Sequence, residues 1–211
     1  MPHAILIHGY ATELRASIFR KPCGGDAGFA GLRHEIQNGS VEVFHWGTPM
    51  NLSFIESLDL RRYLQLYRTE EATAESLITQ STLREYLDNS NPQTVICHSL
   101  GCRLLLNTMN AHGIPESITK IVFLQGDVST TATITNSDIR HRIISKSLII
   151  ENYFCPWDPS LIASMILHGE RRIGLMSWNQ PGIRNIFSPL LKPINLHTSQ
   201  LRNRKFLHNV L

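Results

Sequence analysis

The sequence lacks the features that mark membrane-spanning and nucleic-acid-binding chains. No uninterrupted apolar stretch approaches the length that a helix needs to cross a bilayer, so we expect no membrane span. Lys and Arg number 20 against 17 Asp and Glu, which gives a formal net charge of only +3. Basic residues are scattered, without a stripe in which they alternate with aromatic residues, so we expect no nucleic-acid partner.

The sequence also has few signs of disulfides, metal sites or cofactor loops. Its four cysteines contain no Cys-x-x-Cys pair, and its ten histidines show no spacing typical of metal ligands. No Gly-rich phosphate-binding loop is present. The first residues, Met1-Pro2-His3, lead directly into an apolar run, without the basic region and the small-residue cleavage site of a signal peptide. We therefore predict a cytoplasmic protein with reduced cysteines, without a metal ion and without a cofactor.

The chain has the size and composition of one globular domain over residues 1–211, with 42% hydrophobic and 18% charged residues. Continuous apolar runs predict buried strands, and segments with helical spacing alternate with them. This alternation predicts an α/β fold of three layers, with a mostly parallel central sheet flanked by helices. The predicted strands are 4–7, 41–46, 94–96, 120–127, 147–154 and a last one within 184–196, and the clearest helices are 70–87, 102–109 and 159–167. Residues 47–66 form either a lid segment or ordinary core packing.

Around Ser99 a strand is expected to turn sharply into a helix. The β-branched run Thr94–Ile96 leads into Cys97-His98-Ser99-Leu100-Gly101, and a segment with helical character follows. This is the context of a nucleophile elbow, whose usual pattern is Gly-x-Ser-x-Gly. Cys97 replaces the first glycine of that pattern. The sequence predicts Ser99 as a nucleophile, and the structural alternative is a serine that caps the helix.

A second turn, His8-Gly9, follows the first predicted strand. In a serine hydrolase this loop donates one backbone N–H group to the oxyanion hole, and the residue after the nucleophile donates another. The donors here are predicted to be Tyr10, or its neighbour Ala11, and Leu100. Three further residues near the strand ends, His8, His98 and Asp127, are predicted to line the substrate pocket.

An activated serine needs a base, and the base needs an acid behind it. Two acidic residues, Asp127 and Asp158, follow predicted strands after Ser99, and we favour Asp158. As a structural alternative, Asp158 precedes a predicted helix that begins with Pro159, as a helix cap does.

For the base we favour His208 over His197, because it follows the polar segment Ser199–Lys205. His168 stands at a predicted helix end, where a packing or surface role is expected.

These residues together resemble the α/β-hydrolase superfamily. The resemblance rests on Leu6-Ile-His-Gly-Tyr10, on the elbow at Ser99 and on the later Asp and His. The segment from Tyr153 to Gly174 is similar to that of a group of poorly characterised bacterial serine hydrolases, and Gln125-Gly-Asp127 stands where that group has Ala-Pro-Asp. Their final motif, a His before a small polar residue, matches His208-Asn209 better than His197-Thr198.

The resemblance implies an esterase-like serine hydrolase without a cofactor, which acts on a small-molecule acyl ester or thioester through an acyl-enzyme on Ser99. The alternative is a catalytically silent fold of this type that acts as a binding module. The sequence indicates neither an acyl-chain preference nor an oligomeric state.

Overall fold

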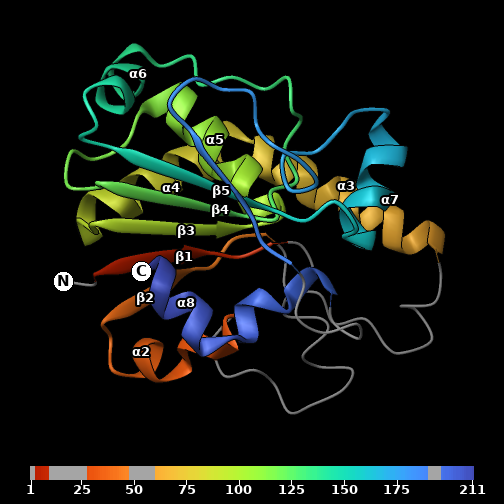
Figure 1. Cartoon of the computed structure of the whole chain (residues 1–211), viewed down its shortest axis with the longest axis horizontal. Helices are drawn as coiled ribbons and strands as arrows, with labels where there is room; N and C mark the ends of the chain where they lie inside the picture. The colour runs from red at the N-terminus through yellow and green to blue at the C-terminus, as the bar shows by residue number, and fades with distance from the viewer. Residues whose placement is uncertain (1–2, 10–27, 48–59, 190–195) are drawn as a thin grey trace.

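A computed structural model of the protein describes residues 3–9, 28–47, 60–189 and 196–211 (Figure 1). Within these ranges six strands form one sheet, in which every neighbouring pair is parallel and the order is β2-β1-β3-β4-β5-β6. The predicted α/β class with a parallel sheet is therefore confirmed. The strands are β1 (Ala4–Ile7), β2 (Val41–Phe44), β3 (Thr94–His98), β4 (Lys120–Leu124), β5 (Ile149–Phe154) and β6 (Arg184–Phe187).

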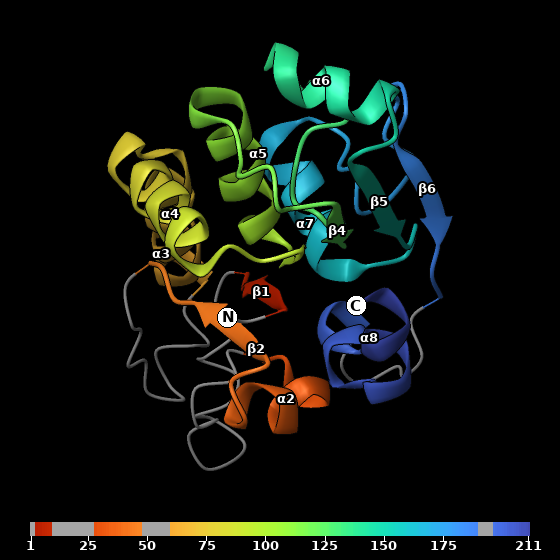
Figure 2. The ribbon, with the colours of Figure 1, turned by 90° about the vertical axis from the view of Figure 1, so that its left-hand side faces the viewer.

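Helices flank the sheet on both faces (Figure 2). One face is covered by α4 (Leu77–Ser90) and α5 (Leu100–His112), with α3 (Leu60–Glu75) and α6 (Ser137–Ile144) beside them. The other face carries η1 (Ala30–Leu32), α2 (Arg33–Gln37) and α8 (Arg204–Val210), while α7 (Pro159–His168) follows β5. Within the described ranges, none of these helices has the length and hydropathy needed to cross a membrane.

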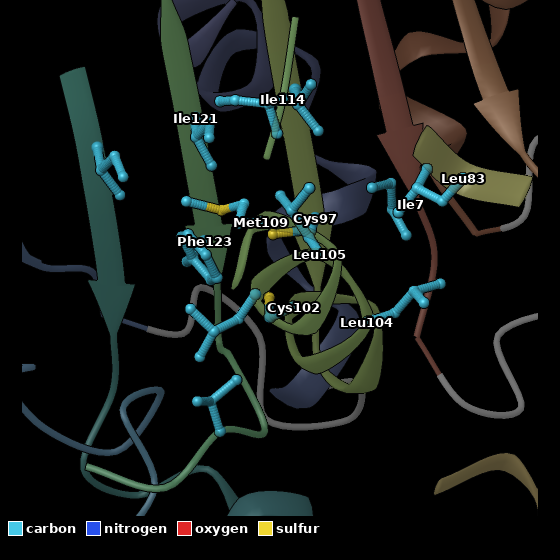
Figure 3. Close-up of a cluster of buried hydrophobic side chains, with 14 of the residues drawn as sticks. Ile7, Leu83, Cys97, Cys102, Leu104, Leu105, Met109, Ile114, Ile121 and Phe123 are labelled. Atoms are coloured by element: carbon cyan, nitrogen blue, oxygen red, sulfur yellow. The ribbon is translucent and has the colours of Figure 1, made fainter. Parts of the chain in front are cut away.

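Alternate side chains of the central strands enter two separate cores. Cys97 and Phe123 point toward α5, where they meet Cys102, Leu105 and Met109 (Figure 3). The intervening strand residues face the opposite layer and pack with residues of η1 and α8; this second core includes Leu6, Ile96, Val122, Leu32 and Leu207. Because both faces are covered, the strands read as continuous apolar runs rather than as alternating ones.

Four element predictions differ from the structure. Residues 70–87 are not one helix, because Ser76 takes an extended conformation (ψ 128°) and separates α3 from α4. The strand predicted over 120–127 ends at Leu124, and the last strand is confined to Arg184–Phe187. The predicted polar loop Ser199–Lys205 instead contains η4 (Gln200–Arg202) and the start of α8.

The candidate lid falls mostly outside the described residues. Residues 48–59 belong to the part of the chain that the structure does not describe, and residues 60–66 form the beginning of α3. The lid therefore stays a prediction.

The connections place a topological switch point between β1 and β3. From β1 the chain runs through η1 and α2, on one face of the sheet, to β2 on one side of β1. From β3 it runs through α5, on the opposite face, to β4 on the other side of the sheet. In open parallel sheets, ligands bind beyond the carboxyl ends of the strands at such a point. Gly9 and Ser99 follow these two strands, so both lie at this edge of the sheet.

The close approach of α5 to β1 depends on Gly101. A Cβ atom at this position would collide with the backbone carbonyl oxygens of Ile7 and His8. These atoms belong to a strand and its end, so they cannot rotate away as a flexible side chain would. The glycine therefore allows the first turn of α5 to pack directly against β1.

We predict that Gly101→Ala lowers the free energy of unfolding by about 2 kcal/mol or more, because overpacking against rigid backbone is not relieved locally. The measurement is urea denaturation followed by circular dichroism. Arg140→Ala, on the exposed side of α6, is the control and should stay within about 0.5 kcal/mol of the wild type. A Gly101→Ala protein as stable as the wild type contradicts the close approach.

Candidate active site

Ser99 occupies a strained turn between β3 and α5. Its backbone angles are φ 53° and ψ −121°, which a non-glycine residue rarely adopts. Two hydrogen bonds hold this conformation, from the Ser99 N–H to the Leu124 carbonyl (3.1 Å) and from the Asp127 N–H to the Ser99 carbonyl (3.0 Å). Such strain persists only where the surrounding structure over-determines it, and here the end of β4 and the turn after it supply the two partners.

The surroundings of Ser99 combine a tight packing contact with a helix N-terminus. A Cβ at Gly9 would lie 2.7 Å from the Ser99 Cβ, so only glycine fits beside the turn. Leu100 is the first residue of α5, and the first N–H groups of a helix have no intrahelical acceptor. The Leu100 N–H is thus suitably placed to bind an anion. The other predicted oxyanion donor, Tyr10, lies outside the described residues.

Asp158 and His197 form a hydrogen-bonded pair at the same edge of the sheet. Asp158 Oδ2 lies 2.7 Å from His197 Nδ1. The other oxygen, Oδ1, accepts the backbone N–H groups of Ser160 (3.0 Å) and Leu161 (3.3 Å), so Asp158 also caps the N-terminus of α7. The two sequence interpretations of Asp158, helix cap and acid, are therefore compatible, because the two carboxylate oxygens have separate partners.

A fourth donor, Gln125, supports the carboxylate of Asp158. Gln125 Nε2 donates to Asp158 Oδ2 over 2.8 Å, and both side chains are fully buried. Burial alone raises the pKa of Asp158, but the nearby His197 and the Leu161 N–H outweigh burial and hold the pKa below its ordinary value. The carboxylate is therefore ionised at neutral pH and orients the imidazole of His197.

The hydrogen bond to Asp158 determines which nitrogen of His197 is available. A carboxylate accepts a proton from Nδ1, which assigns the hydrogen to Nδ1 and leaves the Nε2 lone pair for proton uptake. The His197 ring packs against His98, the neighbour of Ser99, with ring centroids 4.6 Å apart. Although both residues are described, no hydrogen bond joins the Ser99 hydroxyl to His197 in this structure. Such catalytic contacts are often long without substrate.

His208, the favoured base in the sequence, lies elsewhere. It belongs to α8, and its Nε2 is 3.0 Å from Oε1 of Glu35, a residue of α2. Leu207 and Val210 bury the inner side of α8, which leaves the His208 side chain 43% exposed on the outer side. The assignment of His208 as the partner of Asp158 is therefore corrected, and His197 takes that position.

Asp127, the alternative acid, is the centre of a separate buried network. Its carboxylate accepts hydrogen bonds from Tyr67 (2.5 Å) and Ser164 (2.6 Å) and lies 3.2 Å from Arg172 Nε. Burial raises the pKa of Tyr67, so the phenol stays protonated and donates. A further basic residue, Arg103, donates to the Asp127 carbonyl over 3.1 Å. This network connects α3, α5 and α7 to the end of β4.

The two remaining histidines of the predicted pocket are bonded to backbone. His8 Nε2 accepts the Trp46 N–H (3.3 Å), and His8 Nδ1 lies 3.0 Å from the Gly9 carbonyl. His98 Nε2 lies 2.9 Å from the His197 carbonyl, and its side chain is almost completely buried. Burial, with a smaller contribution from the nearby His197, lowers the pKa of His98 to about 3. Both residues thus have structural contacts beside the candidate nucleophile.

A polar cavity of about 310 Å³ opens beside the Asp127 network and is separate from the Ser99 turn. Neither Ser99 nor His197 lines it; its polar lining includes Glu71, Glu75, Arg103, His168 and Arg172. Across the part of the chain that the structure describes, no group of three His, Cys, Asp or Glu side chains is arranged to hold a metal ion.

Comparison with known proteins found no family model that matches the sequence and no matching curated protein. The assignment of a function therefore rests on the residues and the geometry above.

Sequence reasoning missed the residues that support the site from other elements. Gln125 was noted only as part of a motif, and Tyr67, Ser164 and Arg172 were given no electrostatic role. One signal for the base was present, because the apolar positions Leu201, Leu207 and Val210 after His197 indicate a packed C-terminal helix. A helix there leaves His197, and not His208, in the connection that follows β6.

We predict that Asp127→Asn lowers the free energy of unfolding by about 3–5 kcal/mol, because the buried Arg172 guanidinium loses its counter-charge. Thermal and urea denaturation measure the change. The matched control, Glu170→Gln, removes an exposed carboxylate near the same cavity and should be almost neutral. Equal stability of the two variants would show that Asp127 does not compensate a buried charge.

Proposed function

We propose that the protein is a serine hydrolase of the α/β-hydrolase type, which cleaves an acyl ester or thioester through an acyl-enzyme on Ser99. The single observation that carries the proposal is the 2.7 Å contact between Asp158 and His197, whose ring lies against the residue before the strained Ser99. Nucleophile, base and acid of a catalytic triad need such an arrangement.

In the first step, Ser99 Oγ attacks the acyl carbon and His197 Nε2 takes the hydroxyl proton. Asp158 stabilises the resulting imidazolium through Nδ1–H. The carbonyl oxygen becomes negatively charged, and the Leu100 N–H at the positive end of α5 donates to it. Tyr10 remains the predicted second donor. The intermediate then collapses, and the alcohol or thiol leaves with the proton that His197 holds.

In the second step, water replaces the leaving group. His197 Nε2 takes a proton from this water, which attacks the acyl carbon of the ester on Ser99. The second tetrahedral intermediate releases the carboxylic acid and returns the proton to Ser99. No metal ion or redox partner takes part in this scheme.

Two features of the fold support the α/β-hydrolase assignment. The order of the candidate residues along the chain, Ser99, Asp158 and then His197, is the order typical of that superfamily. The Ser99 turn lies at the switch point of a parallel sheet, and Asp158 and His197 follow β5 and β6. Both His197 and His208 come after Asp158, so the order of residues does not distinguish between them as the base. The choice of His197 rests on its contact with Asp158.

We predict that a fluorophosphonate probe labels the wild-type protein and that Ser99→Ala abolishes labelling. Without the hydroxyl no phosphonyl ester forms, and turnover of p-nitrophenyl acetate should fall by at least about 10³-fold. Ser81→Ala, on the exposed side of α4, is the matched serine control and should react like the wild type. Failure of the folded wild-type protein to react with any short acyl ester or probe would reject the hydrolase proposal in favour of the binding module.

We predict that His197→Gln lowers kcat for p-nitrophenyl acetate by about 10³-fold or more, whereas His208→Gln changes it by less than about 2-fold. Only His197 is bonded to Asp158, and glutamine does not accept the serine proton. Steady-state kinetics on both variants provide the comparison. If His208→Gln were the inactive variant, the base would be His208 and the geometric argument would be wrong.

A further inference from the structure

His98 connects the nucleophile turn to the segment that carries the base. It is the last residue of β3, directly before Ser99, and its ring reaches η3 (Leu196–Thr198). Its Nε2 lies 2.9 Å from the backbone carbonyl oxygen of His197, and the two rings are 4.6 Å apart. The elbow strand and the base are therefore linked by a direct contact over about one hundred residues of sequence.

The partner of this contact determines the tautomer of His98. A carbonyl oxygen only accepts hydrogen bonds, so the proton of the neutral ring must be on Nε2. Within the described residues, Nδ1 has no hydrogen-bond partner, and a Cβ at Gly9 would lie 3.0 Å from it. A second proton on Nδ1 would thus be buried without an acceptor. The packing around the ring favours a neutral His98 that donates through Nε2.

His197 is consequently held by hydrogen bonds at both its side chain and its main chain. Asp158 binds Nδ1 of the imidazole, and His98 binds the carbonyl oxygen of the same residue. The carboxylate alone leaves the main chain of η3 able to shift, which would move the Nε2 lone pair relative to Ser99. A displacement of about 1 Å at a reacting group is enough to cost about 100-fold in rate.

We propose that His98 is a positioning residue for the base, which holds the His197 main chain so that Nε2 stays directed toward the nucleophile turn. This role rests on the proposed hydrolase function, but it adds a residue to the reaction that the serine, base and acid do not include. His98 takes up no proton itself, and its contribution is the hydrogen bond from Nε2–H to the His197 carbonyl.

Substitutions at position 98 separate this hydrogen bond from simple packing. The amide Nε2 of glutamine reaches about as far from the main chain as Nε2 of histidine, so His98→Gln retains a donor. His98→Met fills similar space without an N–H group. His98→Asn has a donor that is too short to reach the His197 carbonyl. His141→Gln, on the exposed side of α6, is the surface control.

The experiment measures kcat and KM for p-nitrophenyl acetate and the rate of fluorophosphonate labelling. Turnover rates are divided by the final fraction of protein that the probe labels, which is the end point of labelling. The end point counts folded, competent molecules, so a variant that only unfolds loses end point and keeps its rate per site. We expect His98→Gln and His141→Gln to stay within about 3-fold of the wild type. We expect His98→Met and His98→Asn to lose about 10- to 100-fold in kcat, with KM almost unchanged.

Three results overturn the proposal in distinguishable ways. Normal rates per site in His98→Met and His98→Asn show that the hydrogen bond does not position the base. A loss in His98→Gln equal to that in His98→Met shows that the ring, and not its donor, matters. If the wild type neither turns over esters nor reacts with the probe, the proposed function fails first, and the positioning role fails with it.

Spectroscopy tests the hydrogen bond without activity. The titratable groups that face the ring are His197, Asp158 and His8. In ¹⁵N-histidine spectra of the whole protein, we expect one imidazole that stays neutral in the Nε2–H form from pH 7 to about pH 5, and its signals should vanish in His98→Gln. Protonation of that ring together with the exposed histidines, or an Nδ1–H form, would contradict the contact.

Discussion

The candidate site depends on one buried carboxylate. Asp158 accepts four hydrogen bonds, from the N–H groups of Ser160 and Leu161, from Gln125 and from His197. A buried charge is tolerated only when its lone pairs are satisfied, and these donors come from α7, from the turn after β4 and from the segment after β6. The interaction that orients the imidazole therefore also joins three parts of the chain.

The two acids that follow strands illustrate how environment assigns a role. Asp127 and Asp158 are both buried at the carboxyl edge of the sheet. Asp127 lies against the guanidinium of Arg172 and accepts the hydroxyl groups of Tyr67 and Ser164, so its partners hold α3 and α7 to the end of β4. Asp158 is bonded to the imidazole of His197, a side chain of the type that serves as a general base. The chemistry of the partner, rather than that of the carboxylate, separates a packing role from the proposed catalytic one.

The parts of the fold that could be predicted were those with local signals. Strands β1 and β3 are continuous apolar runs, and Pro159 and Asp158 mark the start of α7, so these elements were predicted to within about two residues. The break between α3 and α4 at Ser76 was not predicted, because the residues on both sides of it have good helical patterns. In the same way, the strained turn at Ser99 has a local motif, whereas Gln125 and His98 gained their roles through contacts that are remote in sequence.

By itself the sequence determined the parallel α/β class, the turn at Ser99 and the position of Asp158 at a strand end, because each depends on residues within one turn or one strand. The choice of His197 over His208 was decided only by tertiary structure. Both histidines follow the last strand, and local sequence does not encode how far the chain folds back. The packing of Leu207 and Val210 against the second core turns His208 outward, while His98 and Asp158 hold His197 at the sheet edge.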